Sequence, residues 1–595
     1  MNPVLTSIPP YLVLAVAALA VLALPRRAGH AAAALATAFT FAQAVLLGDG
    51  GAGAHLATQL FGFDVVLFNV DQFSLLMGVV VGFLATAAVL YAYGSDAPTW
   101  VTAFALIYVS STVGTIYAGD WLTLIFFWEL MAVTSTLLVW QYGGKAVRAG
   151  YRYALFHGIG GTFLLGAVVV HGASMLGSVP ADEIFLFAEA TGIHASATLL
   201  AAIGIGINCG FIFLHTWLPD TYPRPHVAAS VFLSVFTTKT AVYVMYRAFP
   251  DGGMWLAYLG GFMAVYGAFF ALLQYDPRRL LSYHIQAQVG YMLAGLGLAT
   301  YVGDFAVTGG FAHLFNNVLY KSLLFMAVGV VIYRTGVEDI KEMGGLWRVM
   351  PVTFLVYLVG AASITAVPGF NGFISKGMVI DSAHEVHNYE LLLGEGLLWW
   401  LLILGGVGTF MSFIKLGYYM FFHGSATLNP KDATRFQTVG MALAGGACVF
   451  FGTPATYGYL VDLMPFTEAI APQLHPYSTS HLTESAALMA AGFVGFFALK
   501  RPLGWLAHRM PDVDAVTYPA AFYLGRGSVW GVTELWAAVD RFVMDLVGVI
   551  EWTAMHPREA LARAGVDVEI RTGIGRSVLF LTLAAGVALF VFVLS

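Results

Sequence analysis

Long apolar segments recur along this chain, and they constrain its fold more than any other feature. A helix that crosses the hydrocarbon core of a bilayer needs about 20 mostly apolar residues. The sequence therefore predicts an all-α polytopic membrane protein. Its sixteen candidate spans lie near residues 10–24, 30–48, 73–93, 100–118, 121–140, 153–173, 196–218, 227–249, 253–275, 279–299, 305–333, 350–380, 397–423, 437–461, 484–500 and 577–594.

Composition supports this prediction and excludes other classes. Of the 595 residues, 59% are hydrophobic and 10% are charged, whereas a soluble domain carries roughly 25% charged residues. The net charge of −6 is small for this length, so a nucleic-acid partner is not expected. Cys209 and Cys448 lie in apolar segments, and no Cys or His spacing is typical of a zinc or iron–sulfur site. We expect no cofactor and no metal.

Charges between the apolar segments predict the topology. Loops after odd-numbered segments carry Lys and Arg, as at Arg26, Lys145, Arg278 and Lys341, whereas loops after even-numbered segments carry mostly Asp and Glu. Cytoplasmic loops are the ones enriched in Lys and Arg. We therefore expect a multi-pass protein of the cell (inner) membrane with its N-terminus outside. The first segment has no preceding positive charge, which argues against a cleaved signal peptide.

Residues 501–576 differ from the rest because they hold a large share of the charges. An amphipathic helix on the cytoplasmic surface is predicted there. It is either an ordinary linker helix packed on the bundle or an arm that binds a partner. Its apolar stripe consists of Leu535, Val539, Phe542, Val543, Leu546 and Ile550.

Polar and ionisable groups inside apolar segments are the candidates for function. Each ionisable group costs about 2.5–3.5 kcal/mol on insertion scales, so such groups normally face the protein interior or water. A buried Glu–Lys pair can simply hold helices together. A carboxylate, several lysines and a histidine on separate helices are also the groups of a proton relay, because a nearby carboxylate favours the charged form of a buried lysine. The candidates are Glu129, Lys239, His313, Asn317, Lys321, Lys376 and Lys415.

The spacing and setting of three candidates add detail. His313, Asn317 and Lys321 are four residues apart, so they share one helix face. Lys415 lies near a helix end and can instead extend to the membrane interface. Pro219 and Pro368 predict interrupted helices in two separate parts of the chain, a pattern typical of inverted repeats with sites near the midplane.

Five motifs in these segments resemble the antiporter-like family. This family includes the D and A subunits of multisubunit Na+/H+ antiporters, the proton-pumping membrane subunits of respiratory complex I, and relatives in membrane-bound hydrogenases. The resemblance covers about residues 60–425 and implies about fourteen core helices with two inverted five-helix repeats. The motifs are Phe127-Trp-Glu-Leu-Met131, His215-Thr-Trp-Leu-Pro-Asp220, Gln274-Tyr-Asp-Pro-Arg-Arg-Leu-Leu-Ser-Tyr283, His313 through Phe325, and Pro368 through Lys376.

The resemblance implies a role for each matched position. Glu129 matches the fifth-helix glutamate, and Lys239 matches the central lysine of the D-type antiporter and M-type complex I subunits. His313 and Lys321 match the central His/Lys helix. Lys376 matches the terminal lysine of the second broken helix, which the M-type subunit replaces by Glu. Lys239 together with Lys376 therefore favours the D-type antiporter subunit.

Two positions depart from the family pattern. Asn208 stands where the family usually has a lysine nine residues before the Trp of Trp-Leu-Pro-Asp, and Asn317 stands where it has a second histidine. An amide cannot exchange a proton near neutral pH, although it can hold a water. The proton route through the first half is therefore either broken or bypasses Asn208. For a bypass, we expect Asn208 to be buried with polar partners or room for water, and Lys239, the only lysine in the first-half membrane core, to face Glu129 across a polar gap.

The resemblance also divides the chain. N-terminal membrane helices (1–95) are expected before a first antiporter-like half (96–249) and a second one (250–425). C-terminal core helices (426–500), the cytoplasmic amphipathic segment (501–576) and a final transmembrane helix (577–595) follow. This extension loosely resembles the lateral helix of the complex I L-type subunit.

The function that the sequence favours is a D-like subunit that moves H+, or Na+ and H+, within a hetero-oligomeric membrane complex. One alternative is a pumping subunit of a complex I-like or hydrogenase complex, in which the chain would be part of a redox-driven translocase. Another is a non-pumping membrane partner of an inorganic-carbon uptake complex, which Asn208 keeps open. In either antiporter or partner form the chain is not an enzyme by itself.

Overall fold

Each of the sixteen predicted spans contains a helix in the computed structural model, which describes residues 6–188, 192–386, 396–424, 428–507, 509–566 and 574–594. Ten helices of the described chain are long and apolar enough to cross a membrane. The prediction of an all-α polytopic membrane protein is confirmed. The helices within the spans are α2 (Pro10–Ala23), α3 (Arg26–Leu47), α4 (Gln72–Gly94), α5 (Thr99–Ile116), α6 (Trp121–Trp140), α7 (Lys145–Met175), α8 (Thr198–Cys209), α10 (Val227–Val235), α11 (Thr237–Ala248), α12 (Met254–Leu272), α13 (Pro277–Gly297), α15 (Asp304–Thr335), α16 (Pro351–Ile364), α17 (Asn371–Glu385), α18 (Leu397–Gly417), α19 (Arg435–Phe450), α22 (Thr479–Leu506) and α25 (Ile574–Leu594).

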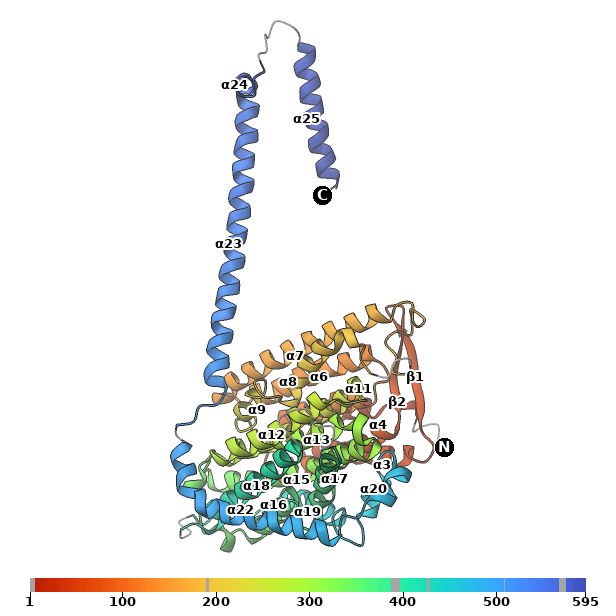
Figure 1. The fold of residues 1–595 in the computed structure, drawn as a ribbon, viewed down its shortest axis with the longest axis vertical. Helices are drawn as coiled ribbons and strands as arrows, with labels where there is room; N and C mark the ends of the chain where they lie inside the picture. Colours follow the sequence, from red (N-terminus) through yellow and green to blue (C-terminus); the bar gives the residue numbers. More distant parts are fainter. Residues whose placement is uncertain are drawn as a thin grey trace. The chain divides into compact units, whose positions relative to one another are not determined.

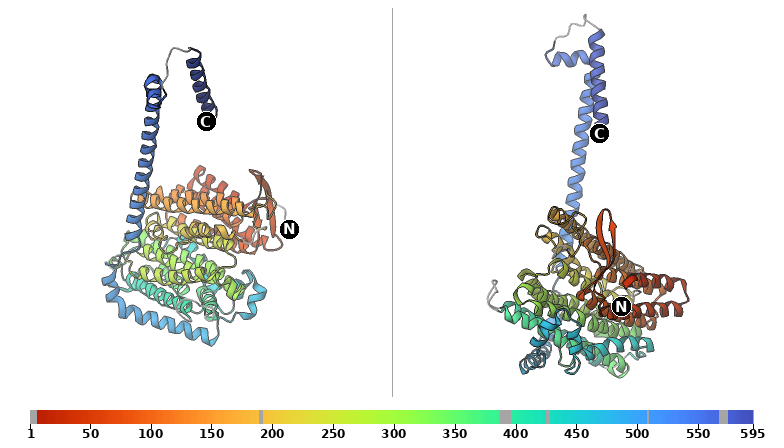
Figure 2. Two further views of the ribbon diagram at one scale, coloured as in Figure 1. Left: turned by 45° about the horizontal axis from the view of Figure 1, so that its top comes forward. Right: turned by 90° about the vertical axis from the view of Figure 1, so that its right-hand side faces the viewer.

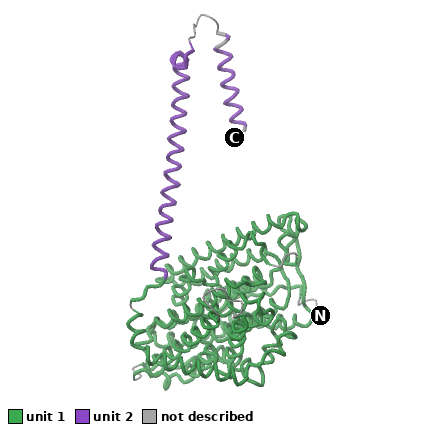
Figure 3. Tube along the Cα trace, viewed as in Figure 1, with its two compact units in different colours: residues 1–512 green, residues 513–595 purple. Residues whose placement is uncertain are grey.

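Two compact units make up the chain, Met1–Asp512 and Val513–Ser595 (Figure 3). The helices of the first unit run side by side, and the colours across this bundle follow the chain broadly from orange to blue (Figures 1 and 2). The second unit contains α23 (Asp514–Met555), α24 (Pro557–Arg563) and α25. The predicted apolar stripe lies on α23, and all six of its side chains are exposed in this single chain.

A β-hairpin interrupts the helices, and the sequence analysis did not predict it. Strand β1 (Gly53–Leu60) pairs antiparallel with β2 (Phe63–Val70). The connecting residues Phe61 and Gly62 have positive φ angles of 54° and 84°, as the two central residues of a type I′ hairpin turn require.

The hairpin holds the start of the helix that carries Glu129. The Asp120 carboxylate accepts a hydrogen bond from the Val66 backbone N–H of β2 at 2.7 Å and another from the Thr123 backbone N–H at 2.7 Å. Asp120 is thus the N-cap of α6, because its side chain satisfies one of the backbone donors that begin the helix. This contact fixes where α6 begins relative to the hairpin.

The first helix interruption lies earlier than predicted. Helix α8 ends at Cys209, Gly210 is left-handed, and Phe213 has a φ of 74° before α9 (Trp217–Thr221) begins. Pro219 itself lies inside α9, so the prediction of a break at this proline is wrong. The reason is that proline is tolerated in the first turn of a helix, where its missing N–H would have no intrahelical partner.

The second interruption lies where it was predicted. Helix α16 ends at Ile364, and Ala366 and Gly369 adopt positive φ angles of 59° and 92° on either side of Pro368. Helix α17 then begins at Asn371. The break leaves backbone carbonyls at the end of α16 without intrahelical partners, and such groups inside a membrane need another donor.

Candidate functional site

Four buried lysines donate to main-chain carbonyl oxygens. No carboxylate of the described residues forms an ion pair with any of them. The interpretation that a Glu–Lys pair holds the helices together is therefore wrong for this part of the chain. Lys239 Nζ donates to the Ser234 carbonyl at 2.9 Å, and Lys321 Nζ donates to the Leu281 carbonyl at 2.9 Å. Lys376 Nζ donates to the Ile364 carbonyl at 3.0 Å. Lys415 Nζ donates to the carbonyls of Leu272 at 2.7 Å and Gln274 at 2.6 Å.

Three of these lysines lie where a helix ends. Lys239 follows an interruption between α10 and α11 at Phe236, and Lys376 bonds the last residue of α16. The C-terminal end of a helix carries partial negative charge, which favours an ammonium group. Lys415 bonds carbonyls at the end of α12 and lies 4.1 Å from the Tyr275 ring centroid. It is 4% exposed, so it does not extend to the interface, and its contacts are those of a structural cap.

Glu129 projects toward α7. It is half-buried, and a Cβ atom placed on Gly161 would lie 1.6 Å from Glu129 Oε1. The glycine at 161 thus leaves the space that the carboxylate fills. No hydrogen bond or ion pair joins Glu129 to Lys239 in the described structure, which is compatible with the expected polar gap between them.

A histidine that the sequence analysis did not select lies one helical turn from Gly161, the glycine beside this carboxylate. His157 is four residues before Gly161 on α7, on the same helix face. Its Nδ1 donates to the Tyr153 carbonyl at 2.9 Å, which leaves Nε2 as the proton acceptor of the neutral ring. Nε2 is buried and has no hydrogen-bond partner in the described residues.

Tyr153 connects this histidine to Lys239. The Tyr153 ring stacks on His157 with centroids 3.8 Å apart, and its hydroxyl lies 3.2 Å from Thr237 Oγ1. The next residue, Thr238, accepts a hydrogen bond from Lys239 Nζ at 3.2 Å. Tyr108 also bonds Thr237 Oγ1, at 2.5 Å. Polar groups therefore run from α7 to α11 without passing through α8.

Asn208 on α8 lies apart from this line. It is fully buried, as expected, but neither its amide oxygen nor its nitrogen has a hydrogen-bond partner among the described residues. Of the two expected alternatives, polar protein partners are therefore not found for Asn208 in the described residues, and room for water stays a prediction. The expectation that Lys239 is the only buried lysine before residue 250 is confirmed for the described chain.

The second half places His313 between α13 and α17. His313 Nε2 lies 3.2 Å from Gln288 Oε1, and Nδ1 lies 3.2 Å from Ser375 Oγ, the residue before Lys376. Tyr320 donates to the same Gln288 oxygen at 3.3 Å and accepts from Asn317 Nδ2 at 3.1 Å. Asn317 therefore orients a tyrosine hydroxyl beside His313.

Lys321 lies on the α13 side of α15, near a second unpredicted histidine. The Phe413 ring lies 6.0 Å from Lys321 Nζ and 5.0 Å from the ring of His284. Both ring nitrogens of His284 are buried without hydrogen-bond partners among the described residues. His284 and Gln288 are four residues apart on one face of α13, and this spacing was the signal that could have identified α13 as part of the site.

Comparisons with known proteins find similarity over the part of the chain that carries these residues. The family model described as NADH:quinone oxidoreductase/Mrp antiporter, TM, matches residues 118–398, which span Glu129 to the start of α18. Over this part of its length the chain is similar to antiporter-like membrane proteins. It is 27% identical over 449 residues to the A-type subunit of the Na+/H+ antiporter of Alkalihalophilus pseudofirmus, covering 69% of this chain and 55% of that protein. It is also 27% identical over 395 residues to the A1-type subunit of the Na+/H+ antiporter of Staphylococcus aureus. That match covers 61% of this chain and 48% of that protein.

The chain spans about half the length of these curated relatives. They are A-type subunits, so they do not support the preference for the D type that Lys239 and Lys376 suggested. Solved structures with the same fold include respiratory complex I from Thermus thermophilus (TM-score 0.66, 22% identity, 80% of this chain and 100% of that one). They also include the archaeal membrane-bound sulfane sulfur reductase (TM-score 0.67, 21% identity, 99% of this chain and 99% of that one). A third is the Mrp complex from Dietzia sp. (TM-score 0.61, 20% identity, 87% of this chain and 99% of that one).

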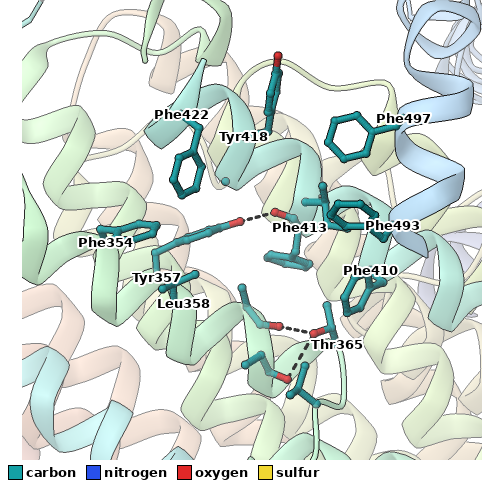
Figure 4. Close-up of a pocket in the computed structure, with 15 residues that line it drawn as sticks. Phe354, Tyr357, Leu358, Thr365, Phe410, Phe413, Tyr418, Phe422, Phe493 and Phe497 are labelled. Carbon is teal, nitrogen blue, oxygen red and sulfur yellow. Dashed lines mark hydrogen bonds between the residues drawn. The ribbon is translucent and has the colours of Figure 1, made fainter. Parts of the chain in front are cut away.

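An apolar groove of about 370 Å³ lies beside Phe413, between α16, α18 and α22 (Figure 4). Its labelled lining is mostly aromatic, and the Tyr357 hydroxyl donates to the Phe413 carbonyl at 2.5 Å. Because Phe413 also lies against Lys321 and His284, its ring separates these two polar groups from the groove. The groove offers no proton path, since its walls carry almost no polar atoms.

Asp512 lies after α22 and bonds to the first broken helix. His215 Nε2 lies 3.5 Å from Asp512 Oδ2, and the hydroxyls of Tyr266 and Tyr283 both donate to this carboxylate. Burial alone would raise the pKa of Asp512, but the hydrogen bonds from His215, Tyr266 and Tyr283, with the charge of His215, lower its pKa to about 2. Asp512 thus attaches the segment after α22 to α12, α13 and the α8–α9 break.

Replacing Asp512 with asparagine should destabilise the folded protein by roughly 2 kcal/mol at neutral pH, at 1.36 kcal/mol per pKa unit. The pKa of Asp512 is lowered on folding, so its stabilisation is complete above the ordinary Asp value and is lost as pH falls toward about 2. Thermal unfolding can be followed with a thiol-reactive dye, because Cys209 and Cys448 are buried until the chain unfolds. Asp540→Asn, at an exposed position of α23, is the control, and equal losses from both variants would contradict this role.

Proposed function

We propose that the chain is a proton-translocating, or Na+/H+-translocating, subunit of a multisubunit cation/proton antiporter. The observation that carries this proposal is a line of buried polar and ionisable side chains across the helices of both halves. In the first half, Glu129 lies against Gly161, one helical turn from His157, and Tyr153 connects His157 to the threonines beside Lys239. In the second half, Lys321 and His284 both lie against Phe413, and His313 contacts Gln288 and Ser375, the residue before Lys376. Such groups are costly within a membrane and are normally retained for transport.

The lysines and histidines are the groups that hold a proton between steps. Lys239 and Lys321 are close enough for the charge on one to act on the other. A proton that arrives at Lys239 therefore disfavours the protonated form of Lys321. The proton that Lys321 releases passes toward His313. Neutral His313 accepts at Nδ1, beside the Ser375 hydroxyl, and Lys376 is the next residue. Charge repulsion between neighbouring sites makes the movement of one proton favour the release of another.

Other membrane subunits complete the proposed complex. Glu129 is half-exposed in this single chain on a helix within the membrane, and a carboxylate at that depth is costly against lipid. The long helix α23 has no buried residue. The relatives are named as antiporter subunits, and similar chains occur in the Mrp complex and complex I. These features support neighbouring subunits against α6 and α23, and H+ with Na+ or another cation as the transported ions.

Everted membrane vesicles test this function directly. Vesicles from cells with the full complex, and from cells lacking this chain, are compared with a fluorescent ΔpH dye while Na+ or K+ is added. We expect cation-dependent proton movement only when the chain is present. Equal proton movement in the two preparations, with the other subunits still assembled, would contradict the proposal.

The alternative of a redox-driven pump is supported by one observation. The chain and its match in the sulfane sulfur reductase complex cover 99% of each other, including the C-terminal arm. The two functions differ in the energy source. Proton movement that follows an added electron donor, and does not follow added Na+ or K+, would favour the redox complex.

The proposed orientation has the N-terminus outside the cell and the loops near 145 and 340 in the cytoplasm. Lys145→Cys and Lys341→Cys variants of the complex, both at exposed positions, should react with a membrane-impermeant thiol reagent in everted vesicles but not in intact cells. The buried Cys209 and Cys448 keep the background low. Reaction of both variants from outside intact cells would reverse the assignment.

A further inference from the structure

The apolar groove runs along α16, from near the start of this helix to the break that follows it (Figure 4). At one end, Phe354 packs against Phe422 with ring centroids 5.4 Å apart, and Thr365 lines the other end. Thr365 follows Phe354 by eleven positions, which corresponds to a rise of roughly 16 Å along a helix. The hydrocarbon of one leaflet is about 15 Å thick, half of the core of the bilayer. The groove is therefore about as long as one leaflet is thick.

The walls of the apolar groove leave little for a polar occupant to bind. Its lining has three hydroxyl groups, and each of them already bonds within the protein. Tyr357 donates to the Phe413 carbonyl at 2.5 Å, and Thr365 donates to a carbonyl of its own helix at 2.6 Å. The Tyr418 hydroxyl accepts a hydrogen bond from Lys500 Nζ at 3.2 Å. The chemistry of the walls thus favours a hydrocarbon occupant.

Basic side chains on α22 lie at the Phe422 end of the groove. Lys500 follows Phe497 of the groove wall by three residues, so both lie on one face of α22. Its Nζ is 4.2 Å from the Tyr418 ring centroid, and the exposed Arg501 is the next residue. An ammonium group has three N–H donors, and the bond to Tyr418 uses one of them. Lys500 can therefore bind a further acceptor at this end.

An exposed arginine lies on the α16 side of the same end. Trp347 packs against Phe422 with ring centroids 6.5 Å apart, and Arg348 Cζ lies 5.0 Å from the Trp347 ring centroid. Tryptophan is enriched at the level of the lipid headgroups, and Trp347 is 40% exposed. In the part of the chain that the structure describes, no carboxylate forms an ion pair with Lys500, Arg501 or Arg348. This end of the groove thus offers unpaired positive charge at the membrane surface.

We propose that the apolar groove binds one acyl chain of an anionic phospholipid, and that Lys500, Arg501 and Arg348 bind the headgroup phosphate. The acyl chain matches the groove in chemistry and in length. Basic side chains next to membrane helices attract anionic headgroups, and here they lie at only one end of the groove. This inference goes beyond ion transport, because it does not depend on which ion the complex moves.

The proposed lipid lies next to the buried polar groups of the second half. The Phe413 ring separates the groove from Lys321 and His284. An acyl chain fills the other side of this ring with hydrocarbon, so that water does not reach the ring from the groove. The chain also contacts α16, α18 and α22 together, because all three helices line the groove. The lipid therefore acts as a fourth wall that keeps this side of the polar groups dry.

Photo-cross-linking tests the site in the assembled complex. The complex is reconstituted in nanodiscs with a small fraction of phosphatidylglycerol that carries a diazirine near the end of one acyl chain. Mass spectrometry then identifies the cross-linked peptides. We expect labelling at the inner end of the groove, in the peptides that contain Thr365 and Phe410. Phosphatidylcholine with the same labelled chain has no net charge, and we expect it to label these peptides much less.

Removing the basic side chains tests how the headgroup is bound. Lys500→Gln together with Arg501→Gln should reduce labelling by phosphatidylglycerol about 25-fold, because each basic side chain at the surface contributes about fivefold in affinity. Lys145→Gln together with Arg148→Gln is the matched control. It removes two exposed basic side chains at the start of α7, which do not line the groove, and it should label like the unsubstituted complex.

Filling the groove tests where the acyl chain lies. Ala361→Trp, on the α16 wall, should abolish the labelling. Ala498→Phe adds an aromatic ring at an exposed position of α22 that does not line the groove, and it should label normally.

Two results would overturn the proposed lipid site. Equal labelling by the two lipids, or by the Lys500 and Arg501 double variant, would show that only ordinary boundary lipid lies there. No labelling of the groove in the unsubstituted complex would show that another subunit covers it. Neither result involves ion movement, so the proposed transport function is tested separately in the vesicles.

Discussion

Replacing Glu129 with glutamine should lower proton transport about a hundredfold, the lower end of what a positioned proton-transfer group contributes, while the complex still assembles. The substitution keeps the shape of the side chain in the space beside Gly161 but removes the only carboxylate in α6. A glutamine amide can neither accept nor release a proton near neutral pH. ΔpH measurements on vesicles with equal amounts of assembled complex give the result, and full activity would show that Glu129 is structural only.

A second substitution separates the charge of Glu129 from its position. In Gly161→Ala the added Cβ would lie 1.6 Å from Glu129 Oε1, so the end of this flexible side chain must move. We expect a smaller but clear loss of transport, because the carboxylate is retained but displaced from His157. Gly158→Ala adds the same methyl group to α7 where no atom lies within 4 Å. Equal activity of these two variants would show that the exact position of the carboxylate is unimportant.

The membrane-spanning helices were predictable because the signal for them is local. A run of about 20 apolar residues contains in itself the reason for crossing a bilayer, and each predicted run contains a helix. The hairpin at residues 53–70 was missed because its strands are short and lie between two such runs. The first break was misplaced because proline was taken as its cause, whereas the left-handed Gly210 and the positive φ of Phe213 make it.

The partners of the buried groups could not be predicted, because they depend on how helices distant in sequence pack. Lys239 and Lys376 were selected correctly as buried lysines, but nothing in the sequence shows that each would bond a carbonyl at a helix break. A histidine such as His157 in an apolar segment is also common in ordinary cores. Only the packing of α6 on α7 shows that it lies one turn from the glycine that receives Glu129.

Substitutions at His157 and Asn208 distinguish a proton route through His157 from one through Asn208. His157→Gln should lower proton transport about a hundredfold, again by removing a positioned proton-transfer group. Glutamine keeps a polar side chain of similar length at this position but cannot carry a proton. Tyr153→Phe should also lower transport, because it removes the hydroxyl that contacts both Ser135 and Thr237.

Asn208→Leu is the matched variant on α8, and we expect it to transport protons as well as the unsubstituted chain. The buried Asn208 amide has no hydrogen-bond partner in the described structure, and an unsatisfied buried polar group costs about 1–3 kcal/mol. A leucine of similar volume should therefore raise the thermal unfolding temperature of the protein. Loss of transport in this variant, with His157→Gln fully active, would show instead that water held at Asn208 carries the proton.

Restoring the family's residue gives the last test of the bypass. Asn208→Lys places the lysine that related chains usually have at this helix position, and it supplies a second titratable group between α7 and the first break. If the chain uses His157 because it lacks that lysine, Asn208→Lys should recover transport in the His157→Gln background, measured with the same ΔpH dye. Asn208→Gln is the control, because it enlarges the side chain without adding a proton-transfer group. Recovery by both variants, or by neither when the complex is assembled, would mean that His157 does not replace the missing lysine.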